Sequence, residues 1–106
     1  MNDWRDPIHP GEILAVELTE IGMKALELAN RIGVPDNRIY QILHGERSIT
    51  ADTALRLGKF FNTGAEFWLN LQKSYELDVA RKQMGNNLEG ITPYQQAGAI
   101  QGVLIA

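Results

Sequence analysis

The sequence predicts an all-α fold of five helices, and three observations lead to this class. Apolar residues recur at helical spacing in five successive segments between residues 9 and 84. Short breaks that contain Gly, Pro or Asn separate these segments. Before residue 85, no segment shows a convincing alternation of apolar and polar residues, so no strand is expected there.

The first helix is expected to begin after His9, because Pro10 suits the first position of a helix. Its apolar side would consist of Ile13, Leu14, Leu18 and Ile21. Gly22 would end this helix. The preceding segment, residues 1–8, is expected to form an irregular N-terminal arm.

The second and third helices are the most informative pair, and they are expected at residues 25–32 and 36–44. Their apolar stripes are Leu28, Ala29 and Ile32 in the former, and Ile39, Ile42 and Leu43 in the latter. Gly33 separates them, because a tight turn needs the positive φ that glycine adopts freely. The small side chain of Ala29 would let the two helices cross closely. This pattern is typical of a helix-turn-helix motif.

The fourth helix is expected to begin after Thr50 and to extend to Phe61. The Thr50 hydroxyl can accept a hydrogen bond from a free amide of the first turn, as N-cap residues do. The apolar stripe would consist of Ala54, Leu57 and Phe61. Gly58 lies inside this helix although glycine costs about 1 kcal/mol relative to alanine there. We therefore expect a close backbone contact between Gly58 and a neighbouring helix.

The fifth helix, expected at residues 65–84, would be the longest. Thr63 and Glu66 have the spacing of a capping box, which predicts where this helix begins. Its buried side is expected to consist of Phe67, Trp68, Leu71 and Tyr75. An aromatic pair such as Phe67 and Trp68 can also anchor a dimer interface.

A tail, residues 85–106, follows the main domain of residues 9–84. Glu89 is its only charged side chain, and Thr92 with Pro93 could start one short helical turn. The apolar residues 99–106 are too few to span a membrane. We expect them to dock on the chain's own core or on a second chain.

The third helix is expected to direct polar side chains outward, as a helix that enters a DNA major groove does. Asn37, Arg38 and Gln41 are the candidate base contacts, because Asn and Gln pair with adenine and Arg with guanine. The candidate contacts to the DNA backbone are Lys24, Tyr40, Arg47 and Thr50. Tyr40 is equally compatible with packing over the edge of the motif, and Lys24 with simple solvation. Arg56 and Lys59 are expected on the solvated side of the fourth helix.

The charge distribution favours DNA although the chain as a whole carries a net charge of −3. Residues 24–59 have a net charge of +2, and the segments before and after them are negative. DNA affinity depends largely on basic side chains that neutralise phosphates. One copy of the chain would therefore bind modestly, and a homodimer is expected to double the phosphate contacts.

The composition argues against several other classes of function. The chain has no cysteine, which excludes disulfides and thiol chemistry. His9 and His44 are distant in sequence and lack nearby acidic co-ligands, so no metal site is expected. No catalytic triad or phosphate-binding glycine loop stands out, and neither an enzyme nor a bound cofactor is expected. The acidic N-terminus predicts no signal peptide or membrane span, and hence a cytoplasmic location.

Residues on both sides of the motif resemble the HigA antitoxins, a branch of the Xre (Cro/CI-type) repressors. The resemblance covers about residues 9–84. It is carried by residues 9–14 before the motif, by residues 45–50 after it, and by residues 54–63 and 67–72. The most specific segments are Pro-Gly-Glu-Ile-Leu at 10–14 and Phe-Trp-Leu-Asn-Leu-Gln at 67–72.

The resemblance implies a lambda-repressor-like helix-turn-helix domain in a homodimer that binds double-stranded operator DNA of its own operon. It also implies a HigB-type ribonuclease toxin that the chain neutralises by binding. Two positions depart from the family pattern: Pro35 replaces the usual Ser or Thr, and Asp36 places a negative charge at the DNA-facing end. Two alternatives remain, a stand-alone Xre-type regulator and a protein-interaction module with little affinity for DNA.

Overall fold

The computed structural model of the chain describes residues 6–95. Its elements are α1 (Pro10–Ile21), α2 (Ala25–Ile32), α3 (Asp36–Leu43), α4 (Ala51–Phe61), α5 (Ala65–Met84) and a short 3-10 helix, η1 (Asn87–Gly90). The described residues contain five α-helices and no strand, which confirms the predicted all-α class. The third helix ends one residue earlier than expected, with His44 as its C-cap.

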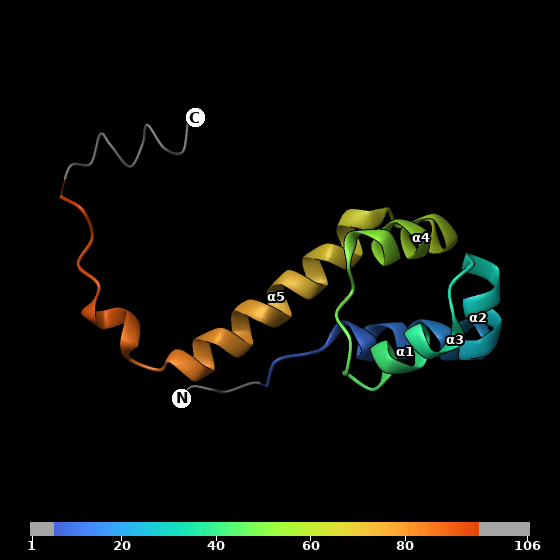
Figure 1. Cartoon of the computed structure of the whole chain (residues 1–106), viewed down its shortest axis with the longest axis horizontal. Helices are drawn as coiled ribbons and strands as arrows, with labels where there is room; N and C mark the ends of the chain where they lie inside the picture. Colours follow the sequence, from blue (N-terminus) through green and yellow to red (C-terminus); the bar gives the residue numbers. More distant parts are fainter. Residues whose placement is uncertain (1–5, 96–106) are drawn as a thin grey trace.

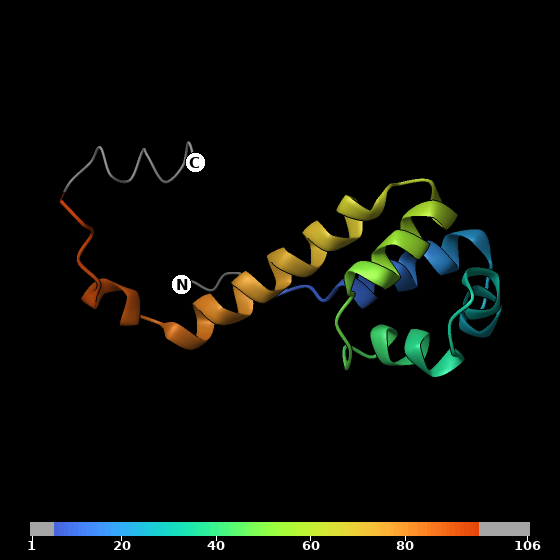
Figure 2. The same ribbon diagram turned by 45° about the horizontal axis from the view of Figure 1, so that its top comes forward.

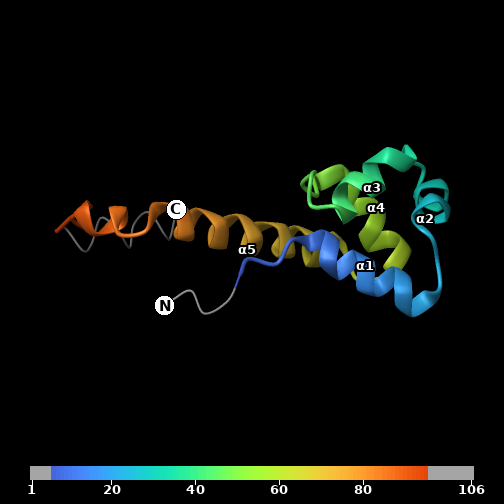
Figure 3. The ribbon, with the colours of Figure 1, turned by 90° about the horizontal axis from the view of Figure 1, so that it is seen from below.

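Helices α1 to α4 gather at one end of the molecule, and α5 leads away from them (Figures 1 and 2). The first turns of α5 pack on α4, whereas its C-terminal half extends beyond the other helices. The segment before α1 runs beside α5 (Figure 3), where the Asp6 carboxylate lies 3.2 Å from Lys82 Nζ. The predicted helix-turn-helix, α2 and α3, therefore lies at the end of the molecule remote from the C-terminal half of α5.

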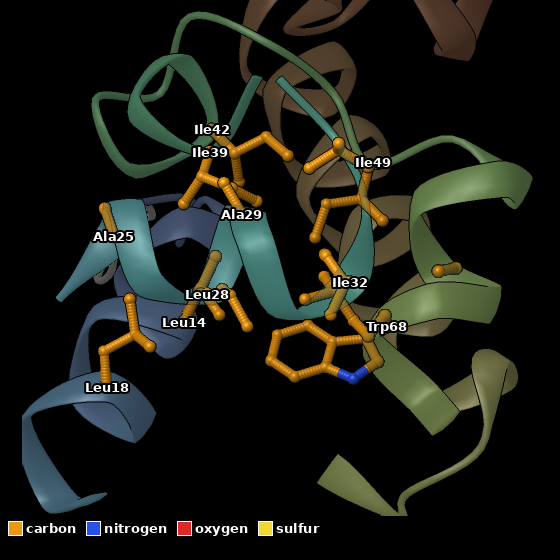
Figure 4. Packing of buried hydrophobic residues seen from close by; sticks show 13 residues of the cluster. Leu14, Leu18, Ala25, Leu28, Ala29, Ile32, Ile39, Ile42, Ile49 and Trp68 are labelled. Atoms are coloured by element: carbon orange, nitrogen blue, oxygen red, sulfur yellow. The ribbon is translucent and has the colours of Figure 1, made fainter. Parts of the chain in front are cut away.

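The core lies among the first four helices and the start of α5. Side chains from α1, α2, α3 and α5 converge there (Figure 4), and Leu14, Leu28, Ile39 and Trp68 are fully buried. Two residues on the predicted apolar sides of helices are exposed: Ile21 of α1 is 49% exposed, and Phe67 of α5, which was expected on the buried side, is 41% exposed. Periodicity identifies the side of a helix but not how far its neighbours extend along it. At the start of α5, only Trp68 of the aromatic pair faces the core.

Gly58 confirms the expected close approach between helices. A Cβ added at Gly58 would overlap the backbone of Gly64 and lie 2.5 Å from the amide nitrogen of Ala65. The Gly58 carbonyl also accepts hydrogen bonds from the amides of Thr63, at 3.1 Å, and Gly64, at 3.2 Å. Glycine at this position therefore lets α4 turn sharply into α5.

Helices α4 and α5 begin where expected, but neither makes the side-chain capping hydrogen bonds that the sequence predicts. Thr50 is the N-cap of α4, but its side chain makes no capping hydrogen bond. The N-cap of α5 is Gly64, so Thr63 and Glu66 form no capping box. The Thr63 hydroxyl instead accepts a hydrogen bond from Trp68 Nε1 at 3.0 Å. A buried indole N–H needs a partner, and this requirement takes precedence over the cap.

The helix start at His9 uses a cap that sequence reasoning missed. His9 Nδ1 accepts a hydrogen bond from the Gly11 amide at 2.9 Å, and the Glu12 carboxylate accepts one from the His9 amide at 3.2 Å. The His9 ring also packs edge-on against Tyr75 of α5, with 4.8 Å between ring centroids. Burial lowers the pKa of His9, which favours the neutral imidazole that Nδ1 needs in order to accept this hydrogen bond.

The helix stop at residue 85 is confirmed, since α5 ends at Met84 and Gly85 adopts a φ of 53°. The turn of helix expected near Thr92 does not begin within the described residues, where 91–94 are extended or irregular. One helical turn, η1, lies earlier, at Asn87–Gly90. The apolar residues 99–106 and residues 1–5 of the arm lie outside the described part. Among the described helices, none has the length and apolar character that a membrane crossing requires.

Candidate nucleic-acid interface

The turn between α2 and α3 has the geometry that the sequence predicts. Gly33 adopts φ 76° and ψ 38°, the left-handed conformation that glycine accepts without strain. The amides of Gly33 and Val34 both donate to the carbonyl of Ala29, at 2.9 and 3.0 Å. Pro35 then starts α3 with an extended backbone, φ −61° and ψ 144°. These contacts close the turn that joins α2 to α3.

Helix α3 is amphipathic, with a buried side and a polar side. Ile39 and Ile42 are fully buried. Of the predicted base contacts, Asn37 is exposed, Gln41 is partly buried, and the Arg38 side chain is 27% exposed. Tyr40, a predicted backbone contact, is 44% exposed. The polar side chains of α3 thus remain at the surface, on a helix whose apolar side is buried in the core.

The side chains of Gln41 and Arg47 are joined by a hydrogen bond. Arg47 Nε donates a hydrogen bond to Gln41 Oε1 at 2.8 Å, which joins α3 to the loop that follows it. Gln72 of α5 holds the same loop, because its Oε1 accepts a hydrogen bond from the Ile49 amide at 2.7 Å. Gln72 is only 5% exposed. The predicted phosphate contact Arg47 therefore lies beside the predicted base contact Gln41, on a loop anchored to α5.

Arg38 and Arg56 share one carboxylate, that of Asp52 in the first turn of α4. Asp52 Oδ1 lies 3.1 Å from Arg38 Nη1 and 2.8 Å from Arg56 Nε. Hydrogen bonding to Arg56, and then to Arg38, lowers the pKa of Asp52. The carboxylate is therefore ionised at neutral pH, between two guanidinium groups.

Arg56 has a role that the sequence analysis did not predict. Its side chain is 42% exposed, as expected for the solvated side of α4, and its Nη1 also donates to the carbonyl of Ile32 at 2.7 Å and to that of Gly33 at 3.3 Å. These carbonyls lie at the C-terminus of α2, where a helix leaves acceptors without partners and favours a cation. The i,i+4 spacing of Asp52 and Arg56 is a sequence signal for their ion pair. The contact with the turn depends on tertiary structure.

The other predicted phosphate contacts lie at helix starts. Lys24 is exposed and is the N-cap of α2. Thr50 is exposed and is the N-cap of α4, at the end of the loop that carries Arg47. Helix N-termini offer amide hydrogens to phosphate oxygens. The structure thus brings together Gln41 with Arg47, and Arg38 with Asp52, and it leaves Asn37, Lys24 and Thr50 at the surface.

Comparison with known proteins identifies the family to which this chain belongs. The family model for helix-turn-helix domains, HTH_3, matches residues 15–68. Virulence-associated protein I of Dichelobacter nodosus is 47% identical over 76 residues, which are 71% of this chain and 70% of that protein.

Two solved structures are similar to most of the chain. An addiction module antidote protein of the HigA family from Coxiella burnetii is 55% identical, with a TM-score of 0.82 over 85% of this chain and 100% of that one. Antitoxin HigA of Pseudomonas aeruginosa, solved with the higBA promoter, is 42% identical, with a TM-score of 0.78 over 82% of this chain and 97% of that one. The chain therefore belongs to the helix-turn-helix family HTH_3 and, within it, to the HigA-type antitoxins.

Proposed function

We propose that this chain is a sequence-specific DNA-binding antitoxin that represses its own operon and neutralises a HigB-type ribonuclease toxin. The observation that carries the DNA-binding part is the polar side of α3, which Gly33 and Arg56 hold at the surface of the helical core. The relative from Pseudomonas aeruginosa is described with promoter DNA, which supports the same class of ligand here.

In the proposed complex, α3 enters the major groove of operator DNA. Asn37, Arg38 and Gln41 contact base edges, and each good bidentate pair is worth about 1–3 kcal/mol of discrimination. The residues proposed to contact the DNA backbone are Lys24, Tyr40, Arg47 and Thr50. They lie on three different elements, so they would fix the orientation of α3 rather than read the sequence.

Two variants that each remove one positive charge separate these roles. Arg38→Ala is expected to weaken binding to a duplex that the wild-type chain selects from a randomised pool, by about 1–3 kcal/mol, and to relax the preference at one base pair. Lys24→Ala is expected to weaken binding to selected and scrambled duplexes alike and to reduce the salt slope by about 1. Fluorescence anisotropy titrations at several salt concentrations measure both. Equal losses on both duplexes for both variants would contradict the assignment, and a wild-type chain without sequence preference would refute the proposed function.

We also propose a homodimer, in which the C-terminal half of α5 packs against a second copy. Leu77 is 46% exposed and Met84 is 36% exposed. They are seven residues apart, so they share one side of α5, in the part that extends beyond the other helices. Trp68 is fully buried and cannot contribute to an interface, although its neighbour Phe67 can. Two copies would double the number of phosphate contacts.

If this dimer forms, a charge at Leu77 should weaken dimerisation far more than a charge at a similarly exposed leucine elsewhere. Leu26 of α2 is 49% exposed, against 46% for Leu77, and provides the matched position. Leu77→Glu should give monomers in sedimentation equilibrium and lose operator affinity, because a carboxylate resists burial in an apolar contact. Leu26→Glu should remain dimeric. Identical association constants for the two variants would rule out this interface.

The toxin partner and the cytoplasmic location rest on family membership. Co-purification with the product of the adjacent reading frame, together with growth protection when both are expressed, tests the antitoxin role. If no small basic protein is encoded there, a stand-alone Xre-type regulator becomes the better description. If the partner binds but DNA does not, the chain is a protein-interaction module.

A further inference from the structure

Asp52 connects the recognition helix to the turn that precedes it. Its Oδ1 accepts from Arg38 Nη1 at 3.1 Å and from Arg56 Nε at 2.8 Å. Arg56 in turn donates to the carbonyls of Ile32 and Gly33 at 2.7 and 3.3 Å. The Arg38 guanidinium is thus linked, through one carboxylate and a second guanidinium, to the backbone of the helix-turn-helix turn.

These linked contacts can position the Arg38 side chain, but they contribute little to the stability of the fold. The Asp52 side chain is 58% exposed and that of Arg56 is 42% exposed, so water and salt compete with both ion pairs. Asp52 occupies only one of the five N–H donors of Arg38. The donors that remain are sufficient for a bidentate pair with the O6 and N7 acceptors of guanine.

We propose that Asp52 is a specificity-determining residue that acts through Arg38. By holding the guanidinium in one orientation, Asp52 reduces the rotamer freedom that Arg38 would lose on meeting a base. Its negative charge also offsets the attraction between Arg38 and phosphates, which is the main source of sequence-independent binding. Asp52 thus lowers affinity for random DNA and preserves affinity for the operator, as an element that acts against the wrong ligand does.

This inference rests on the proposed DNA-binding function, and its test is arranged so that the two fail separately. The probes are a duplex that the wild-type chain selects from a randomised pool and a scrambled duplex of the same composition. The variants are Asp52→Asn and Asp52→Glu, each alone and combined with Arg38→Ala. The control Glu46→Gln makes the same change of charge as Asp52→Asn in the exposed loop that carries Arg47.

Asp52→Asn is expected to bind the scrambled duplex more tightly and to lose about tenfold in its preference for the selected duplex. The loss should concentrate at the base pair whose preference Arg38→Ala relaxes, and Asp52→Glu should restore part of it. Glu46→Gln should strengthen binding to both duplexes equally. In the Arg38→Ala background, Asp52→Asn should no longer change the preference, because the residue through which it acts is gone.

Two results would overturn the inference while leaving the proposed function intact. One is an Asp52→Asn chain whose preference for the selected duplex equals that of the wild type. The other is a loss of preference that is the same with and without Arg38, which would assign Asp52 a general electrostatic or structural role. Failure of the wild-type chain to prefer any duplex would instead refute the proposed function itself. Circular dichroism of each variant checks that it remains folded.

Discussion

Replacing Trp68 by alanine is expected to lower the free energy of unfolding by about 3–5 kcal/mol, the range typical of a buried tryptophan. Trp68 is fully buried where α4 and α5 meet, and its ring contacts those of Phe61 and Phe67. Its removal leaves a cavity. The Thr63 hydroxyl also loses the hydrogen bond that it accepts from the indole N–H. In a domain of this size such a loss is a large fraction of the total stability. Urea unfolding followed by far-ultraviolet circular dichroism measures it.

The neighbouring Phe67 provides the control for this prediction. Phe67 is 41% exposed, so Phe67→Ala should cost much less unfolding free energy than Trp68→Ala. The sequence alone does not distinguish these adjacent aromatic residues. If the two substitutions cost the same, the placement of Trp68 in the core and Phe67 at the surface would be wrong.

Gly11→Ala is expected to destabilise the chain by about 1–3 kcal/mol or more, the range for overpacking, and to weaken DNA binding. A Cβ at Gly11 would overlap the carbonyl of Ile42, a backbone group near the C-terminal end of α3. The overlap cannot be relieved by a side-chain rotation, so α1 and α3 must move apart. Because α3 is the proposed recognition helix, a displacement of this kind also moves its polar side chains away from the DNA.

The expected destabilisation is opposite in sign to the effect that helix propensity predicts. Alanine is favoured over glycine within a helix by about 1 kcal/mol, so helix propensity alone predicts that Gly11→Ala stabilises the chain. Gly90→Ala is the control, since nothing lies within 4 Å of a Cβ at that position. Thermal unfolding and operator titrations of both variants provide the comparison. A Gly11→Ala chain as stable as the wild type would show that α1 and α3 are not in close contact.

Much of the fold follows from local features of the sequence. The five helices begin and end close to where apolar spacing, Pro35 and the glycines at 22, 33 and 85 predict. Each of these three glycines has a positive φ. Such signals operate over a few residues, and the backbone responds to them in nearly any tertiary context. The exposure of Ile21 and Phe67 was not predicted, because burial depends on the extent of a neighbouring helix.

The candidate site was predictable as a set of residues but not as a set of contacts. Helical periodicity places Asn37, Arg38 and Gln41 on the polar side of α3, and the structure agrees that this side is at the surface. Their assignment as base contacts stays a prediction. Neither of the two contacts at this site, between Gln41 and Arg47 and between Arg38 and Asp52, was anticipated. Both join residues on different elements, so no spacing rule reveals them.

The sequence by itself determined the number and order of the helices, the turn at Gly33 and the polar side of α3, because each depends on the local preferences of a short segment. Only the tertiary structure decided which polar groups meet. It paired Thr63 with the buried Trp68 indole instead of a helix end, and it directed Arg56 to the carbonyls of the turn. The physical reason is that a hydrogen-bonding group takes the partner that packing brings within reach, and packing is a property of the whole chain.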